Sequence, residues 1–203
     1  MINSRHDFPQ NECLGVVLAG GLSSRMGQDK ARLPHNATDM LNFSKQLLIN
    51  SGVNNIIVSG DGYDVPDKIK QNGPVGGIYS VLSSFPMTKS LLILPVDLPF
   101  MTASVLKNLR IKGELSQKAT YFKGHSIPLY LPNSAYLELF FSQAFAQNVE
   151  INSSKKTTKK NGPSIKSLLE QIPHQVMQVD DDKTLFNTNT PEQWQQAVKQ
   201  FTV

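Results

Sequence analysis

The stretch CLGVVLAGGLSSRMGQDK, residues 13–30, decides the fold of this chain. Its first six residues, Cys13–Leu18, are short and apolar, which predicts a buried β-strand rather than a helix. Gly20 and Gly21 follow directly, so we expect them at the carboxyl end of that strand. In open α/β sheets, ligands gather at this edge.

The residues after the strand favour a phosphate-binding loop. Gly20 and Gly21 have no Cβ, so their N–H groups are expected to turn inward toward anionic oxygens. Arg25 offers a planar fork of donors and Lys30 a mobile point charge. The loop is neither a P-loop nor a dinucleotide fingerprint. From the residues alone, a plain turn with solvated Arg and Lys remains an alternative.

Strand and helix patterns alternate along the rest of the chain. Such alternation predicts an α/β fold with a doubly wound, mostly parallel sheet. Thr38 and Asp39 are capping candidates for the first helix, and Thr190, Pro191 and Gln193 have the pattern of a capping box. Strands are predicted at 13–18, 55–59, 90–94, 120–122 and 126–131, and helices at 40–49, 75–85, after Thr102, at 133–147 and after Thr190.

The length of the chain is that of one domain, and its net positive charge is concentrated in one stretch. We expect residues 1–203 to form a single nucleotide-handling unit, with residues 1–12 frayed. The net charge of +4 is local, because four of the 20 Lys and Arg residues lie in the polar stretch 152–162 and the other 16 equal the Asp and Glu in number. We interpret this stretch, with Lys155, Lys156, Lys159 and Lys160, as a flexible basic loop. A mobile flap for an anionic substrate and a nucleic-acid tract are the alternatives.

The sequence gives no sign of export or of membrane insertion. There is no run of about 18 apolar residues and no secretory segment, so we expect a cytoplasmic protein that contacts neither membrane nor nucleic acid. The single cysteine, Cys13, is interpreted as a small buried apolar residue rather than a nucleophile.

Two acidic residues are candidates for the site. Asp97 follows an apolar strand and is held between Pro95 and Pro99, which suits a carboxylate ligand for Mg²⁺; the alternative is a turn aspartate with a local hydrogen bond. From the residues alone, Asp67 is interpreted as a solvated loop acid beside Lys68.

The loop LAGGLSSRMGQDK at 18–30 resembles the signature of the molybdenum cofactor guanylyltransferases, of the nucleotidyltransferase superfamily. Three further segments follow in family order, GPVGGI at 73–78, LPVDLPF at 94–100 and FNTNTPE at 186–192. The resemblance implies a Rossmann-like nucleotidyltransferase fold. Gly20-Gly21 with Asp29-Lys30 favours GTP, because cytidylyl-transferring relatives commonly have Ala-Gly in the turn.

The resemblance also implies which residues form the site. It makes Arg25, Lys30 and Asp97 catalytic, with Asp97 as the metal ligand for Mg²⁺. Asn187 and Asn189 are implied as secondary residues near the metal and the transferred phosphate. The nucleotide-binding residues implied are Leu18, Ala19, Gly20, Gly21, Lys30, Asp67, Gly76, Gly77 and Asp97. Among them, the resemblance implies that Asp67 helps to recognise the guanine.

The resemblance implies that GMP is transferred from GTP to the terminal phosphate of molybdenum-molybdopterin, with release of pyrophosphate. A phosphate dianion needs no general base, so positioning and charge neutralisation carry such a reaction. We expect Lys30 at the α-phosphate and Arg25 on the leaving pyrophosphate. Transient contact with molybdenum cofactor biosynthesis proteins or recipient enzymes is implied as well.

The chain departs from the family pattern after the second predicted strand. Ser59-Gly60-Asp61 stands where relatives often have an Asn-rich tip, which leaves the strictness of guanine selection open. The alternatives are a cytidylyltransferase or sugar-phosphate nucleotidyltransferase, a non-catalytic nucleotide-binding protein and, last, a nucleic-acid binder. Acceptor identity, oligomeric state and the choice of Mg²⁺ or Mn²⁺ are not fixed by the residues.

Overall fold

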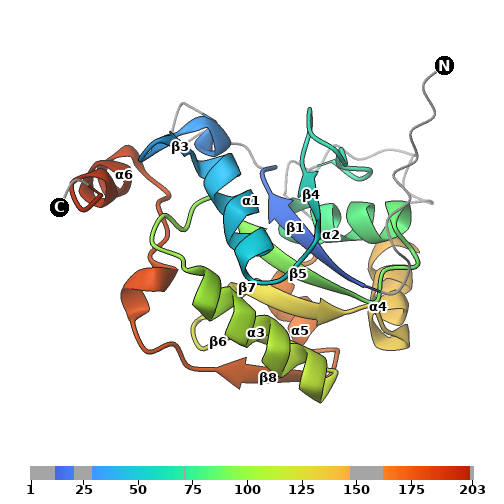
Figure 1. Cartoon of the computed structure of the whole chain (residues 1–203). Helices are drawn as coiled ribbons and strands as arrows, with labels where there is room; N and C mark the ends of the chain where they lie inside the picture. Colours follow the sequence, from blue (N-terminus) through green and yellow to red (C-terminus); the bar gives the residue numbers. More distant parts are fainter. Residues whose placement is uncertain (1–11, 21–28, 71, 147–161, 202–203) are drawn as a thin grey trace.

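A six-stranded sheet in the order β4-β1-β5-β7-β6-β8 organises the chain (Figure 1). The computed structural model describes residues 12–20, 29–70, 72–146 and 162–201. β1 pairs in parallel with β4 and β5, β7 runs antiparallel to β5 and β6, and β8 is parallel to β6. The strands are β1 (Cys13–Leu18), β4 (Asn55–Ser59), β5 (Ser90–Pro95), β6 (Ala119–Phe122), β7 (His125–Pro132) and β8 (His174–Met177).

Helices cover both faces of the sheet (Figure 1). α1 (Met40–Asn50) and α3 (Ala103–Ser116) lie over one face, and α2 (Gly73–Ser84), α4 (Ala135–Ala146) and α5 (Ile165–Leu169) lie over the other. Each face has its own core, since Val16 and Ile93 pack toward α2 and α4, whereas Val17 and Leu92 pack toward α1 and α3. Residues of β1 and β5 are therefore apolar on both sides, as expected of central strands.

A smaller apolar cluster joins the C-terminal helix to the segment after β1. Leu33, Met40 and Trp194 are buried together, with Phe43 and Phe201 packed against them. Leu33 lies between η1 (Lys30–Arg32) and β2 (Pro34–His35), and β2 pairs with β3 (Thr38–Asp39). Met40 and Phe43 belong to α1 and Trp194 to α6 (Pro191–Val198), which η2 (Asp182–Leu185) precedes. Residues far apart in the sequence are thereby fixed at one end of the sheet.

The predicted fold class is confirmed, and the five predicted strands are present. Asp39, Thr102 and Thr190 cap their helices as expected, but Thr38 instead pairs with His35 in the β2-β3 hairpin. Asn133 does not start a helix: its amide donates to the carbonyls of Pro86 and Thr88, and α4 begins at Ala135.

Other predictions were incomplete. α2 begins two residues earlier than expected, and the predicted end of α4 at 147 lies outside the described residues, as do 1–11 of the expected frayed terminus and 152–161 of the basic loop. The sequence patterns missed α5 and β8, which are only 5 and 4 residues long. Within the described part of the chain, no helix is long and apolar enough to cross a membrane.

Candidate active site

Three parallel strands end side by side at the edge of the sheet where the candidate residues lie. Leu18 of β1 pairs with Ser59 of β4 and with Pro95 of β5. The chain beyond these ends supplies Gly20, Gly60 and Asp97, so residues from three separate stretches meet at one edge. This is the placement expected for a ligand site in an open α/β sheet.

Gly20 makes a close backbone approach, but not to a phosphate. A Cβ at Gly60 would lie 2.7 Å from Gly20 N, and Gly60 has a φ of +149°, so that position requires glycine. The N–H groups of Ala19 and Gly20 both donate to the Ser59 carbonyl, at 2.9 and 3.1 Å. The expectation that the Gly20 N–H faces anionic oxygens is therefore wrong, because pairing with the end of β4 continues past the strand.

Lys30 lies at the centre of a polar cluster. Its Nζ donates to Asp97 Oδ2 at 3.0 Å and to Asn189 Oδ1 at 2.8 Å. The side chains of Lys30 and Asp97 are only 17% and 15% exposed, so this ion pair is shielded from bulk solvent. η1 sets the position of Lys30, since Asp29 caps it by accepting from the Ala31 N–H and also accepts from the Tyr63 hydroxyl at 3.0 Å.

The segment before α6 runs along Asp97. Thr188 donates to the Asp97 carbonyl twice, from its N–H at 2.9 Å and from its hydroxyl at 3.2 Å. Among the described residues, Asp97 Oδ1 and Asn187 Oδ1 are buried oxygens without a hydrogen-bond partner. Oxygens of this kind are suitable ligands for a hard cation. Without a ligand or a hydrogen-bond donor, their burial is unfavourable because they have lost their hydrogen bonds to water.

Asp67 belongs to a second group, on the side of the site toward α2. A Cβ on Gly20 would lie 3.7 Å from Asp67 Oδ2, and one on Gly77 would lie 3.7 Å from Asp67 Oδ1 and 3.0 Å from Ser59 Oγ. Ser59 Oγ is another buried atom without a hydrogen-bond partner among the described residues. Burial and the nearby Asp61 raise the pKa of Asp67, against the opposing charge of Lys70.

The remaining predicted residues divide into three cases. Leu18 and Ala19 lead into the site but pack mainly in the two cores, and Gly76 faces Asn72, with a virtual Cβ 2.7 Å from Asn72 Cβ. Lys30 contacts both Asp97 and Asn189, and Asn187 has an unpaired buried oxygen among the described residues. Gly21 and Arg25 lie outside the described residues.

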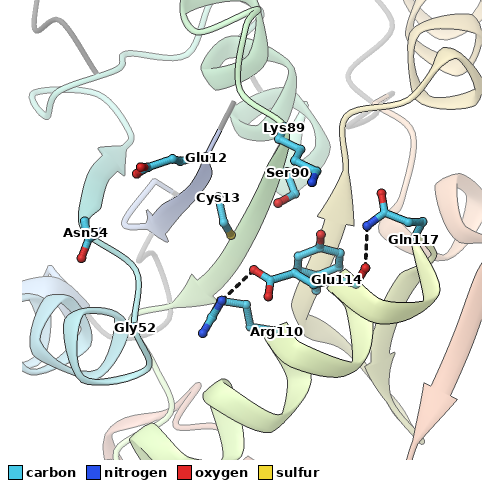
Figure 2. Close-up of a pocket in the computed structure, with 10 residues that line it drawn as sticks. Glu12, Cys13, Gly52, Asn54, Lys89, Ser90, Arg110, Glu114 and Gln117 are labelled. Carbon is cyan, nitrogen blue, oxygen red and sulfur yellow. Dashed lines mark hydrogen bonds and ion pairs between the residues drawn. The ribbon is translucent and has the colours of Figure 1, made fainter. Parts of the chain in front are cut away.

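A separate hollow lies at the opposite edge of the sheet, where the strands begin (Figure 2). It has a volume of about 350 Å³ and includes the Arg110–Glu114 ion pair of 2.7 Å. Burial raises the pKa of the Cys13 thiol to about 11, which agrees with the interpretation of Cys13 as an unreactive residue. This hollow lies at the end of β1 away from Gly20 and Lys30.

The sequence comparisons show to which family the chain belongs. The family model described as "MobA-like NTP transferase domain" matches residues 15–140. The chain belongs to this family. It is accordingly a nucleotidyltransferase, and the matched residues include Lys30, Asp67 and Asp97.

Two relatives are similar over most of the chain. A molybdenum cofactor guanylyltransferase from Xanthomonas euvesicatoria pv. vesicatoria is 30% identical over 194 residues, 93% of this chain and 96% of that protein. A probable molybdenum cofactor guanylyltransferase from Flavobacterium johnsoniae is 25% identical, over 85% of this chain and 88% of the relative.

Solved structures share the fold. The molybdopterin-guanine dinucleotide biosynthesis protein A from Archaeoglobus fulgidus has a TM-score of 0.64 at 19% identity, over 93% of this chain and 98% of that one. A Mycobacterium tuberculosis H37Rv protein, crystallised as a complex with manganese, has a TM-score of 0.57 at 16% identity, over 92% and 98%.

Reasoning from sequence missed three residues of this site. Thr188 was seen only as the residue between two asparagines, Gln193 only as a helix cap and Ser59 only as a departure from the family. The contact of Thr188 with Asp97 joins segments that are distant in the chain, which local patterns do not show. The capping-box pattern was the signal that pointed toward Gln193.

Proposed function

We propose that this nucleotidyltransferase transfers GMP from GTP to the terminal phosphate of molybdenum-molybdopterin, giving molybdopterin guanine dinucleotide and pyrophosphate. The contact of Lys30 with Asp97 and Asn189 at the carboxyl edge of β1, β4 and β5 carries the proposal. This contact places the ammonium of Lys30, which can bind a phosphate, beside the carboxylate of Asp97, which can bind a metal ion. Membership of the family and the named relatives favour this reaction.

The residues present fit a divalent cation, and we propose Mg²⁺. Asp97 and Asn187 would hold it, because each has a buried Oδ1 that no described hydrogen-bond donor satisfies. Magnesium is commonly bound by one or two carboxylates together with substrate phosphates, which agrees with a single acidic ligand here. When bound, the ion would neutralise negative charge on the α-phosphate and the leaving group.

Lys30 would stabilise the charge that grows on the transferred phosphate. A terminal phosphate oxygen of the acceptor forms a bond to the α-phosphorus of GTP, and the bond from that phosphorus to the bridging oxygen breaks, so pyrophosphate leaves with the electron pair. The acceptor dianion has no proton to give up, so no general base is required. Arg25 is proposed to hold the pyrophosphate and Gly21 to complete the loop around it.

The group formed by Asp67, Ser59 and Gly77 is proposed to receive the guanine. A carboxylate accepts hydrogen bonds from the N1–H and 2-amino edge of guanine, which cytosine and adenine do not present in the same arrangement. Gly77 lets the start of α2 lie close to Ser59 and Asp67, because a Cβ there would lie 3.0 Å from Ser59 Oγ. An unpaired buried acceptor would penalise the wrong base by about 1–3 kcal/mol.

A two-stage assay tests this function. Thermal stabilisation is measured with GTP, CTP, ATP and UTP, each with and without Mg²⁺, because a ligand that binds the folded state raises its melting temperature. Pyrophosphate release and dinucleotide formation are then measured with molybdenum-molybdopterin. Selective stabilisation by GTP and acceptor-dependent release of pyrophosphate are expected.

Other results would point to the alternatives. Turnover with CTP in place of GTP would make the protein a cytidylyltransferase. GTP binding without turnover would make it a non-catalytic binding protein, and equal stabilisation by all four nucleotides would remove the base-recognition role of Asp67.

A further inference from the structure

The start of α6 is held by a reciprocal pair of hydrogen bonds. Thr190 Oγ1 accepts from the Gln193 N–H at 3.3 Å, and Gln193 Oε1 accepts from the Thr190 N–H at 3.1 Å. These two bonds complete a capping box, and they satisfy two of the donors that a helix N-terminus leaves unpaired. Nothing more is required of Gln193 for the helix to begin.

Gln193 nevertheless makes a third bond, outside the helix. Its Oε1 also accepts from the Asn189 N–H, at 2.7 Å, which is shorter than either bond of the capping box. The side chain of Asn189 accepts in turn from Lys30 Nζ at 2.8 Å. The side-chain oxygen of Gln193 therefore holds the backbone of Asn189, and the side chain of Asn189 contacts the ammonium of Lys30.

Both ends of the Lys30–Asn189 contact belong to one packed unit. Trp194, the residue after Gln193, is 8% exposed and lies in the small cluster with Leu33. Leu33 directly follows η1 and donates from its N–H to the Lys30 carbonyl at 3.3 Å. α6 is thus docked on the segment that carries Lys30, so a shift of Gln193 relative to η1 is opposed by packing.

We infer that Gln193 is a positioning residue for Lys30. A lysine side chain has four rotatable bonds, and the ammonium of Lys30 is confined because it donates to Asp97 on one side and to Asn189 on the other. Gln193 holds the backbone N–H of Asn189 and thereby the position of the Asn189 side chain. The ammonium of Lys30 is in this way fixed where the triphosphate of GTP is proposed to bind. This role rests on the proposed function, in which Lys30 acts on the phosphates.

The first part of the test separates positioning from helix capping. Gln193→Ala removes both bonds of the amide oxygen, whereas Thr190→Ala weakens the cap and leaves the Gln193–Asn189 bond. We expect kcat/KM for GTP to fall about tenfold in Gln193→Ala. Thr190→Ala and the exposed control Gln196→Ala should keep the wild-type value, and Gln193→Glu should restore it because a carboxylate accepts from the same N–H groups.

The second part asks whether Gln193 acts through Asn189. In an Asn189→Ala background, Gln193→Ala should give no further loss, because the side chain that it orients is gone. Equal losses in the two backgrounds, or a loss in Thr190→Ala as large as in Gln193→Ala, would overturn the inference. Fluorescence of Trp194, the single tryptophan, shows whether α6 stays docked in each variant.

A readout that needs no turnover keeps this inference separate from the proposed function. The rate at which an amine reagent labels Lys30, followed by mass spectrometry, should rise in Gln193→Ala and stay unchanged in Thr190→Ala and Gln196→Ala. Equal labelling rates in all variants would refute the positioning role. A wild-type protein that forms no dinucleotide would instead refute the proposed function.

Discussion

Lys30 Nζ lies 3.0 Å from Asp97 Oδ2, although 67 residues separate the two in the chain. η1 presents the lysine and the turn after β5 presents the aspartate, so the pair joins the first and the third strand ends of the site. Two of the three donors of the Lys30 ammonium are used, by Asp97 and Asn189, which leaves one for a phosphate. Asp97 Oδ1 has no hydrogen-bond partner among the described residues, which leaves it for a cation. The predictions on Lys30 and Asp97 follow from these two unused groups.

Lys30→Ala should lower kcat for dinucleotide formation at least about 100-fold, as for loss of one preorganised donor to a developing anion. The measurement is steady-state turnover at saturating GTP and acceptor. Lys118→Ala is the control, because Lys118 is an exposed lysine between α3 and β6, away from this edge. Unchanged turnover in Lys30→Ala would remove Lys30 from the reaction.

Asp97→Asn should abolish the part of the GTP-induced stabilisation that depends on Mg²⁺. The amide keeps the shape of the side chain but loses the charge that a divalent cation requires. The protein is heated with GTP in the presence and absence of Mg²⁺, and we expect the two melting temperatures to coincide in the variant. A metal at 100 times its Kd adds about 2.7 kcal/mol, so the loss is measurable.

Asp182→Asn is the matched control for this experiment, since Asp182 is an exposed aspartate in the first turn of η2. It should respond to Mg²⁺ as the wild type does. A Mg²⁺ response that survives in Asp97→Asn would assign the metal to other ligands.

Much of the fold could be predicted from local patterns, because its central strand and its helix caps are specified by residues that are close together in the sequence. The apolar run of Cys13–Leu18 and the polar caps Asp39, Thr102 and Thr190 each specify structure over a few positions. β8 was missed for the same reason: it has four residues, of which two are polar, and its pairing with β6 depends on a contact about 55 residues away.

The contacts of the site were beyond what local patterns determine. Sequence order placed Lys30 and Asp97 at strand ends, but it could not show that Asn189, 159 residues away, accepts from Lys30. Nor could it show that the Gly20 N–H is taken by the Ser59 carbonyl, because that bond depends on how far pairing with β4 continues. The glycine at position 20 predicted a close backbone approach, but it could not show which group lies next to it.

Asp67→Asn should weaken the preference for GTP over CTP and change how stability depends on pH. Burial raises the pKa of Asp67 in the folded state, so folding favours the protonated form. The wild type should therefore lose stability as pH rises from about 3.8 through that raised pKa, and the variant should lack this loss. Urea denaturation of both proteins without nucleotide, at pH 3.5 and pH 7, measures the difference.

At pH 7 the nucleotide-free variant should be at least as stable as the wild type. Asp64→Ala is a useful contrast, because Asp64 accepts from the Val58 N–H and the alanine variant loses this bond, which should destabilise the chain. A lower stability of Asp67→Asn at pH 7, together with unchanged base preference, would make Asp67 a structural residue.

Gly113→Ala should destabilise the fold by about 1–3 kcal/mol, although alanine is the better helix former. A Cβ at Gly113 would overlap Cδ1 of Tyr130, so the ring or α3 must move. Denaturation in urea measures the effect, and Lys112→Ala at the neighbouring exposed position serves as control. In a Tyr130→Leu background the penalty should disappear, because the ring that causes it is absent.

Cys13 should resist alkylation in the folded protein and titrate only in strong base. A rise of its pKa from 9.0 to about 11 lowers the thiolate fraction at neutral pH about 100-fold relative to the unfolded chain. The rate of reaction with iodoacetamide at pH 7.5, native against urea-unfolded, measures this ratio. Similar rates in both states would show that the thiol is exposed and ionises normally.

The same shift predicts an effect on stability in base. The thiol ionises first in the unfolded chain, so the wild type should lose stability as pH rises from 9 toward 11. Cys13→Ala should lack that part of the loss, which amounts to about 2–3 kcal/mol for a shift of this size. Because Cys13 lies at the start of β1 and the proposed site lies beyond its end, dinucleotide formation by the variant at pH 7.5 should match the wild type. A large loss of turnover would instead show that the two edges of the sheet are coupled.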